Sequence, residues 1–357
     1  MSTRAERLAT LLPDAGVDAL LVTNLVNVRY LTGFSGSNGM VLVGRDLRAF
    51  ATDFRYVEQA AAEVDPSFDR LRASQDLLDA IAEALPGGEL RLGFEAADVS
   101  VHDHGRLRER LPERVGLAGT HGLIEQLRAV KSAGELAAIR AASELADAAF
   151  TELISGRFVG RTERELAMAL EFGMRRLGAE SASFEPIVAG GPHAALPHAQ
   201  PRDVELAAGE LVVIDWGAQL DGYCSDCTRT VAAGRAGDRG QEIYQLVLEA
   251  QRHGVEAVRA GAPGREVDAV AREMIEAAGH GEQFGHGLGH GVGLEVHEAP
   301  RLSQRSESVL EAGNVVTVEP GVYLPGELGV RIEDLVVVTA GGCEILTSLT
   351  KDLVTVA

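Results

Sequence analysis

The feature that most constrains this chain is a set of four carboxylates in or beside apolar, strand-like runs of its second half. Asp215 lies in LVVIDWGA, Asp226 in GYCSDCTRTV, Glu319 in NVVTVEPGVY and Glu333 in GVRIEDLVVV. An ionised carboxylate in an apolar strand costs several kcal/mol unless it is paired or bound to a cation. One such residue could have a basic partner, but four of them, with His290 close by in the sequence, predict a metal site.

Two turn signals arrange these carboxylates in pairs. A turn at Gln219-Leu220-Asp221-Gly222 would bring Asp215 nearly opposite Asp226. A second turn around Pro325-Gly326 would place Glu319 opposite Glu333. Directly opposed residues of an antiparallel pair have Cβ atoms about 4.5–5.5 Å apart, where like charges repel unless cations lie between them. The two hairpins therefore predict a pseudo-symmetric site for two metal ions.

A weak internal repeat with a period of about 101 residues agrees with this pairing. Arg164-Glu165-Leu166 recurs as Arg265-Glu266-Val267, and Gly178 recurs as Gly279. Each copy would be two helices followed by a two-stranded hairpin. Two amphipathic helices of equal length look alike by chance, so the helices alone leave the repeat open, and the paired hairpins favour it.

The predicted ligands also indicate a chemistry. Four carboxylates with one imidazole favour manganese, iron or cobalt, with zinc possible. Carboxylates can hold two such ions about 3.5–4 Å apart, and a water between them becomes a hydroxide nucleophile near neutral pH. His198, His286 and His297 flank the same region, which indicates polarising and proton-shuttling groups rather than isolated core or surface histidines. The glycine-rich run FGHGLGHGVGLEVHEAP opposes the helix of an H-E-x-x-H protease.

Composition excludes several other classes of protein. The 357 residues are 46% hydrophobic and 24% charged, as in a globular protein, and no apolar run approaches the roughly 18 residues of a membrane span. The net charge of −20 argues against a nucleic-acid partner.

Cys224 and Cys227 form a C-x-x-C, which could be read as a zinc knuckle or a redox motif. Both alternatives are disfavoured because strand positions three apart face opposite sides. The N-terminus is typical of a helix and strand rather than a signal peptide, and the three cysteines then predict a reduced cytoplasmic protein.

Two domains are expected, one over residues 1–125 and one over residues 126–357, with the boundary inside 122–132. The first would be an α/β unit with strands at 18–23, 40–43 and 48–52 and helices at 55–64, 74–85 and 103–112. The second would open with an amphipathic helix from Ala133 to Leu153, for which Ser132 is a suitable N-cap.

With these motifs the chain resembles the metallopeptidases of the creatinase/aminopeptidase P ("pita-bread") fold, and most closely the small prolidases (Xaa-Pro dipeptidases) and Xaa-Pro aminopeptidases. The second half carries the resemblance through ALPHAQP, VVIDWGAQLDGYCSDCTRTV, GHGLGHGVGLEVHEAPRLS and VVTVEPGVYLPGELGVRIED. The first half matches more loosely, through NVRYLTGFSGSNG and TDFRY. The resemblance implies an α/β (α+β) chain, with a creatinase-like α/β domain followed by a pita-bread metallopeptidase domain with a pseudo-twofold repeat.

The resemblance also implies a role for each candidate residue. Two divalent ions per chain, with manganese favoured, would be held by Asp215, Asp226, His290, Glu319 and Glu333, with Asp226 and Glu333 bridging. Glu319 would also be the general base. His198 and His297 would steady the scissile carbonyl and the oxyanion, His286 would line the substrate pocket, and Arg331 would orient the ligands. No ligand of the family is missing, which disfavours creatinase and a non-catalytic peptide-binding module, and the leading α/β domain disfavours methionine aminopeptidase.

The resemblance leaves two proline-specific substrates open. A dipeptidase must hold the free carboxylate after proline, and Arg301 resembles the arginine that prolidases use for it, although a solvent-facing arginine is an equal alternative. The run NVRYLTGFSGSNG is closer to aminopeptidases P, which cleave longer peptides. The balance favours the dipeptidase, with a homodimer as the assembly common in the family. Phe184, Phe284 and Tyr323 are candidates for an apolar wall around proline, although core packing is the more ordinary role for each.

Overall fold

The structure, a computed structural model, describes residues 2–357. Contacts within the chain divide it into a smaller unit that ends at Arg128 and a larger unit from Ala129 to Ala357. Each unit encloses its own buried apolar residues. Within residues 2–357, no helix is both long and apolar enough to span a bilayer.

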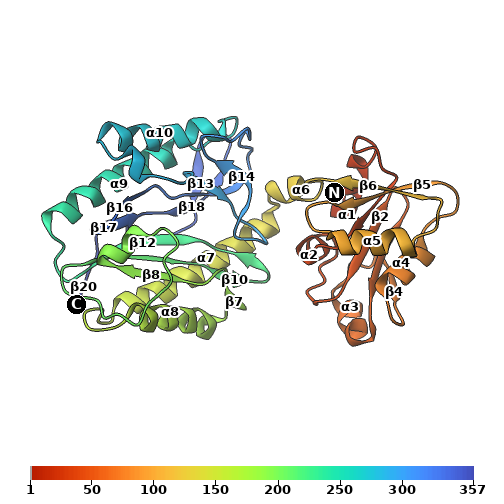
Figure 1. Ribbon diagram of the computed structural model, residues 1–357, viewed down its shortest axis with the longest axis horizontal. Helices are drawn as coiled ribbons and strands as arrows, with labels where there is room; N and C mark the ends of the chain where they lie inside the picture. Colours follow the sequence, from red (N-terminus) through yellow and green to blue (C-terminus); the bar gives the residue numbers. More distant parts are fainter. Residues whose placement is uncertain (1) are drawn as a thin grey trace. The chain divides into compact units, whose positions relative to one another are not determined.

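The smaller unit is a six-stranded mixed sheet with helices packed against it (Figure 1). Its strands are β1 Ala19–Val22, β2 Met40–Gly44, β3 Arg48–Thr52, β4 Asp69–Arg72, β5 Leu90–Glu95 and β6 Val115–Thr120, in the order β4-β3-β2-β1-β5-β6. Its helices are α1 Arg4–Leu11, α2 Leu25–Thr32, α3 Val57–Glu63, α4 Leu77–Ala84 and α5 Val101–Arg110, and α6 Glu125–Ala129 crosses the boundary. The α/β class is confirmed, as are all three expected strands and all three expected helices.

The larger unit contains two copies of one arrangement. The first copy comprises α7 Ala133–Ile154, α8 Glu163–Leu177, β7 Ser181–Ala182, β8 Ile187–Gly190, β9 Leu211–Trp216, β10 Ala218–Leu220, β11 Tyr223–Cys224 and β12 Cys227–Ala233. The second comprises α9 Asp238–Ala257, α10 Gly264–Ala277, β13 Gly289–Gly291, β14 Glu298–Leu302, β15 Val315–Val318, β16 Gly321–Leu324, β17 Leu328–Arg331, β18 Asp334–Val338 and β19 Cys343–Ile345, and β20 Thr355–Val356 returns to β12. A short 3-10 helix, η2 (Gly191–Ala195), follows β8.

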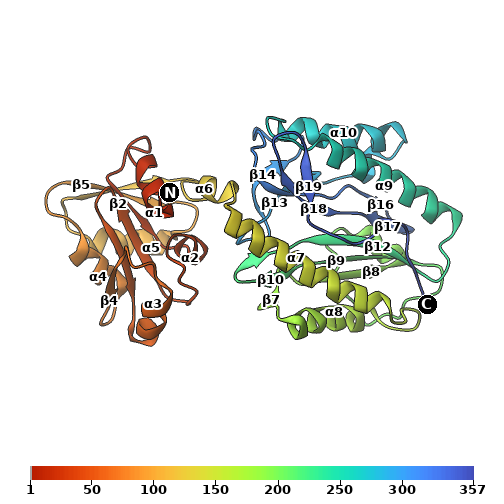
Figure 2. The same ribbon diagram turned by 180° about the vertical axis from the view of Figure 1, so that it is seen from behind.

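Strand order confirms the predicted internal repeat. Antiparallel pairs join β8, β9 and β12 in the first copy and β13, β15 and β18 in the second. The second helix of each copy begins at Glu163 and at Gly264, which are 101 positions apart (264 − 163). One helix pair, α7 and α8, lies on one side of the strands, and the other pair, α9 and α10, lies on the opposite side (Figures 1 and 2). The expected N-cap also forms, because Ser132 and Glu135 make a capping box at the start of α7.

Alternation along β9 turns one carboxylate away from the helices. Val212, Ile214 and Trp216 pack into the core beneath α7 and α8, where the Trp216 indole donates to the Ala146 carbonyl at 3.0 Å. Successive strand residues point to opposite faces, so Asp215 faces the second copy. The apolar neighbours on β9 thus fix the direction of this carboxylate.

In the second copy, the strand register places the two carboxylates opposite each other, as the hairpin prediction requires. In the first copy, the register shifts the two carboxylates relative to each other. Val318 pairs with Asp334 and Gly321 with Arg331, so the intervening Glu319 and Glu333 lie at the same level. In the first copy Asp215 pairs with Thr228, two residues beyond Asp226. The turn between β10 and β11 has positive φ at both Asp221 (50°) and Gly222 (80°), as a tight hairpin turn requires.

Candidate metal centre and peptidase site

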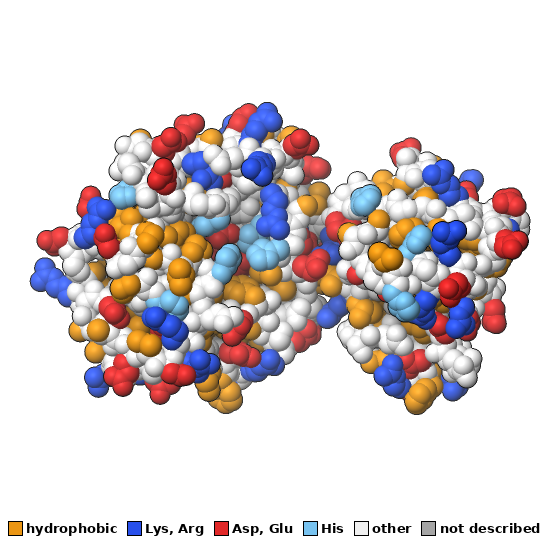
Figure 3. Space-filling model, viewed as in Figure 1, with side chains coloured by type: hydrophobic (Ala, Val, Ile, Leu, Met, Phe, Trp, Pro, Cys, Tyr) orange, Lys and Arg blue, Asp and Glu red, His pale blue; other side chains and the backbone are white. Residues whose placement is uncertain are grey.

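All ten predicted site residues line one cavity of about 560 Å³ in the larger unit. They are His198, Asp215, Asp226, His286, His290, His297, Arg301, Glu319, Arg331 and Glu333. In the space-filling view, histidine side chains gather around a recess of this unit (Figure 3). Residues separated by more than a hundred positions in the sequence therefore share one hollow.

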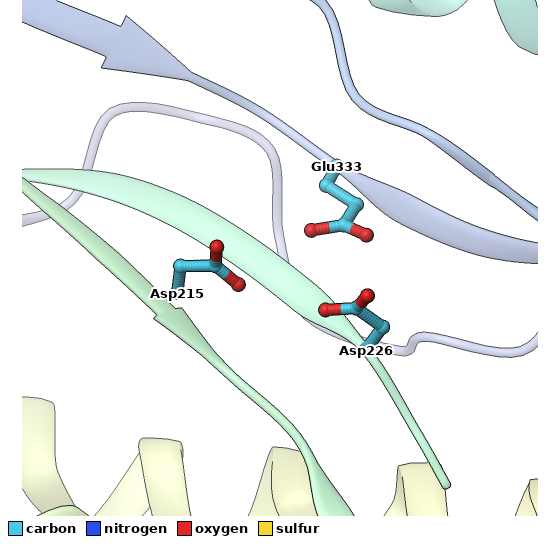
Figure 4. Close-up of side chains that lie close together, drawn as sticks. All are labelled: Asp215, Asp226 and Glu333. Carbon is cyan, nitrogen blue, oxygen red and sulfur yellow. The ribbon is translucent and has the colours of Figure 1, made fainter. Parts of the chain in front are cut away.

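Three carboxylates converge at the base of the site. Asp215, Asp226 and Glu333 each offer an oxygen, and these oxygens lie within 4.8 Å of one another (Figure 4). Burial raises the pKa of all three carboxyls, and the neighbouring carboxylates raise it further. Asp215 Oδ1 and Glu333 Oε1 are buried and have no hydrogen-bond partner among residues 2–357. Unpaired buried oxygens facing like charges are suited to a cation, which would satisfy both.

Glu319 and His290 complete the set of donors. His290 Nε2 lies 3.2 Å from Glu319 Oε1 and 3.5 Å from Asp226 Oδ2. His290 Nδ1 lies 3.1 Å from the Gly291 carbonyl, which can only accept, so in the neutral ring the proton is on Nδ1 and Nε2 keeps its lone pair. Burial alone would raise the pKa of Glu319, but a protonated His290, which donates to Glu319 Oε1 through Nε2, and the nearby Arg331 outweigh it and hold this pKa well below its usual value. Five oxygen and nitrogen donors of this kind fit divalent cations.

Threonine hydroxyls orient two of the carboxylates, and sequence reasoning did not single them out. Thr228 donates to Glu333 Oε2 at 2.8 Å, and Thr317 donates to Glu319 Oε1 at 3.0 Å. Thr228 lies two positions after Asp226 and Thr317 two positions before Glu319, hence on the ligand face of each segment. That spacing was the signal that could have found them.

Arg331 connects the two copies behind the ligands. Its guanidinium donates to Asp215 Oδ2 at 2.6 Å, to the Thr228 hydroxyl at 3.0 Å and to the Tyr323 hydroxyl at 2.8 Å. It also donates to the carbonyl of Pro197, the residue before His198, at 3.2 Å. The arginine therefore contacts a predicted ligand of the first copy from β17 of the second, and reaches the loop that carries His198.

Tyr323 takes a polar position rather than the apolar one considered from sequence. Its hydroxyl lies 2.9 Å from His286 Nε2, while His286 Nδ1 faces the Gly287 carbonyl at 2.8 Å. Burial lowers the pKa of His286, so the ring is neutral, with its proton on Nδ1, and Nε2 accepts from Tyr323. Phe284 is buried in the core, and of the three aromatic candidates only Phe184 lines the cavity.

The remaining predicted residues lie around the rim. The His297 ring packs edge-on against His290 with centroids 4.4 Å apart, and burial lowers the pKa of His297. His198 is exposed on the loop after η2. Arg301 on β14 pairs with His290 in the strand register, and its guanidinium is exposed without a hydrogen-bond or ion-pair partner among the described residues. Cys224 and Cys227 are free and lie in different apolar clusters, so they do not form the alternative C-x-x-C site.

Comparison with known proteins identifies the family of the chain. The family model of metallopeptidase family M24 matches residues 137–340, and that of the creatinase/prolidase N-terminal domain matches residues 4–130. The chain belongs to metallopeptidase family M24. An M24 peptidase with a creatinase-type N-terminal domain is what the sequence motifs predicted, and both the family and the fold are confirmed.

Individual M24 relatives match almost the whole chain. An Xaa-Pro dipeptidase of Pyrococcus furiosus is 37% identical over 99% of this chain and 100% of its own length. The structure of an Xaa-Pro dipeptidase from Bacillus anthracis superposes with a TM-score of 0.95 at 42% identity, covering 99% of both chains. An X-Pro aminopeptidase structure from Thermotoga maritima gives a TM-score of 0.91 at 39% identity, over 99% of this chain and 100% of that one. Proteins named as Xaa-Pro dipeptidases and a protein named as an X-Pro aminopeptidase are thus all similar to this M24 peptidase.

Proposed function

We propose that this M24 peptidase is an Xaa-Pro dipeptidase that binds two divalent metal ions. The observation that carries the proposal is the convergence of Asp215, Asp226 and Glu333, with two unpaired buried oxygens, in a cavity that also holds His290 and Glu319. These five residues would hold the ions. When bound, two such ions supply a strong oxygen nucleophile near neutral pH and polarise the scissile carbonyl.

The residues of the chain would divide the remaining work. Glu319, whose low pKa keeps it ionised, would accept the proton of the attacking water and return it to the leaving proline nitrogen. His297 and His198 would donate to the carbonyl oxygen and to the oxyanion that forms from it. His286 and Phe184 would border the proline ring. An Xaa-Pro bond is a tertiary amide without an N–H, so the site needs no backbone acceptor for that group.

Arg301 supports a dipeptide rather than a longer substrate. Its exposed guanidinium lines the cavity and has no partner in the part of the chain that the structure describes. A guanidinium binds a carboxylate through two parallel hydrogen bonds, and a dipeptide ends in a carboxylate directly after proline. The second candidate is an Xaa-Pro aminopeptidase, favoured by the likeness to the Thermotoga maritima structure.

Hydrolysis of Ala-Pro and Ala-Pro-Ala by Arg301→Ala separates these candidates. A dipeptidase clamp predicts that the wild type prefers Ala-Pro and that the variant loses about 10- to 100-fold in kcat/KM on Ala-Pro, the size expected for a charge-assisted pair. Arg305→Ala, an exposed arginine near β14 that does not line the cavity, is the matched control. Unchanged turnover of Ala-Pro by Arg301→Ala, together with a preference for Ala-Pro-Ala, would establish the aminopeptidase instead.

We also propose a native metal, a cellular location and an oligomeric state for this peptidase. Manganese is the proposed native metal, because carboxylate-rich sites with a single imidazole suit it. Metal analysis of protein purified from its own organism checks that assignment. The three free cysteines support a reducing cytoplasmic location, and light scattering in solution tests the homodimer that the family resemblance implies.

A further inference from the structure

A buried carboxylate outside the metal centre holds the loop that carries His198. The Glu163 side chain, at the first residue of α8, is 1% exposed. It accepts hydrogen bonds from the backbone N–H of Gly190 (3.0 Å) and of Arg202 (2.9 Å), and from Arg202 Nε (3.1 Å) and Nη2 (2.9 Å). His193 Nδ1, 3.0 Å from both carboxylate oxygens, can only donate to them. Burial alone would raise the pKa of Glu163, but these donors outweigh it and lower the pKa, so the carboxylate stays charged.

These donors lie at the two ends of one segment and near its start. Gly190 is the last residue of β8, His193 lies in η2, and Arg202 follows the Pro201 that ends the cavity-lining stretch. Between them lies His198, which has no strand or helix of its own to fix its position. The Glu163 carboxylate on α8 therefore joins the two ends of this loop, and Arg331 contacts the loop between them at the Pro197 carbonyl.

The second copy of the repeat holds its own histidine loop in a related way. Asp268 of α10 is fully buried and binds Arg272 through Nε (2.7 Å) and Nη2 (2.9 Å). Arg272 donates to the carbonyls of Phe284 (2.9 Å) and His286 (2.7 Å), and Asp268 accepts from the Leu288 N–H at 2.9 Å. In both copies, a buried acid on the second helix and an arginine fix a segment that carries a cavity-lining histidine.

We propose that Glu163 and Asp268 are positioning residues, which act through His198 and His286 without touching the substrate. The inference rests on the proposed roles of these two histidines. A misplacement of about 1 Å at a group that contacts the reacting atoms can cost on the order of 100-fold in rate, so the anchors should be visible in kinetics.

A double-mutant cycle between Glu163→Gln and His198→Ala tests the first anchor on Ala-Pro. Glu163→Gln should lower kcat/KM by about 10- to 100-fold and leave bound metal unchanged. When His198 is already alanine, adding Glu163→Gln should change kcat/KM by less than about twofold, because the group that it positions is gone. The exposed ion pair of Asp203 with Arg164 gives the control Asp203→Asn, which should behave like wild type.

Equal losses from Glu163→Gln in the two backgrounds, or loss of bound metal, would overturn the inference. A His198→Ala variant with wild-type kinetics would instead overturn the proposed role of His198, so the two failures are distinguishable. If Glu163→Gln does not fold, Arg202→Gln takes its place, because Arg202 is half-exposed. Hydrogen exchange at the amides of Gly190 and Arg202 gives a readout apart from activity and should speed up in either variant.

For the second anchor, Arg272→Gln should raise KM for Ala-Pro only while His286 is present. An equal rise in KM when His286 is already alanine would refute the positioning role of Asp268 and Arg272.

Discussion

At the scale of single residues, the carboxylate cluster favours metal binding at the expense of the metal-free fold. Burial and mutual repulsion raise the pKa values of Asp226 and Glu333, because each carboxylate is buried and faces the other carboxylates of the cluster. Neutralising one of these groups should therefore have opposite effects with and without metal.

We expect Glu333→Gln to raise the melting temperature of the metal-free protein by about 2–4 °C, since it removes one repulsive charge and the amide oxygen still accepts from Thr228. In metal-loaded protein the same change should lower the melting temperature, because a proposed metal ligand is lost. Thermal melts with excess chelator and with excess manganese measure both, and Glu307→Gln on the exposed surface is the control. A lower melting temperature in both conditions would show that the cluster is not under repulsion.

The contribution of Glu163 to the free energy of unfolding should depend on pH in a defined direction. Its pKa in the folded protein is lowered from the ordinary value of 4.5, so at pH values near 4.5 the folded state binds fewer protons than the unfolded state. Its stabilising contribution is present above pH 4.5 and is lost as the pH falls through the folded pKa. The difference in unfolding free energy between wild type and Glu163→Gln should thus be constant near neutral pH and shrink below about pH 4.5. Denaturant titrations at several pH values test this, and a difference that grows on acidification would contradict it.

At the scale of elements, close backbone approach makes one glycine of β17 sensitive. A Cβ at Gly329 would lie 1.8 Å from the Ala194 carbonyl oxygen in η2, the element before His198. Gly329→Ala should therefore push β17 and η2 apart and destabilise the protein by about 1–3 kcal/mol, the usual cost of overpacking. The unfolding midpoint in urea measures it. Gly341→Ala is the control, because its Cβ would meet no atom within 4 Å, and an equal effect of both changes would refute the packing argument.

Elements with a strong local pattern were predictable from sequence, and those defined by distant contacts were not. The run LVVIDW and the capping signal at Ser132 gave β9 and the start of α7 directly. In contrast, β4 of the smaller unit has no buried position, so its sequence shows no apolar alternation that would predict a strand. The same limit applies to the site: each predicted carboxylate ligand stood out as a charge in or beside an apolar run, whereas the proposed role of Glu163 depends on Arg202, 39 residues away.

At the scale of the whole molecule, the two units should respond differently to metal. All predicted ligands lie in the larger unit, and so does Trp216, the single tryptophan of the chain, stacked on Phe150 with centroids 4.2 Å apart. Tryptophan fluorescence therefore reports unfolding of the larger unit alone, while circular dichroism reports both units.

We expect a chelator to shift the fluorescence midpoint to a lower temperature, because a ligand that binds only the folded state stabilises it. The part of the circular dichroism change that belongs to the smaller unit should stay in place, since that unit has its own core and holds none of the predicted ligands. An unchanged fluorescence midpoint after complete metal removal would contradict a metal centre in the larger unit.

The most direct test of a two-metal Xaa-Pro peptidase is the rate of Ala-Pro hydrolysis as metal is added back to the metal-free protein. The rate should be negligible without metal and should rise until two ions are bound per chain, and Asp226→Asn, which removes a proposed metal ligand, should abolish the rise. Absence of hydrolysis of Ala-Pro and Ala-Pro-Ala with manganese, cobalt or zinc bound at two ions per chain would contradict the assignment of this cavity as a peptidase site.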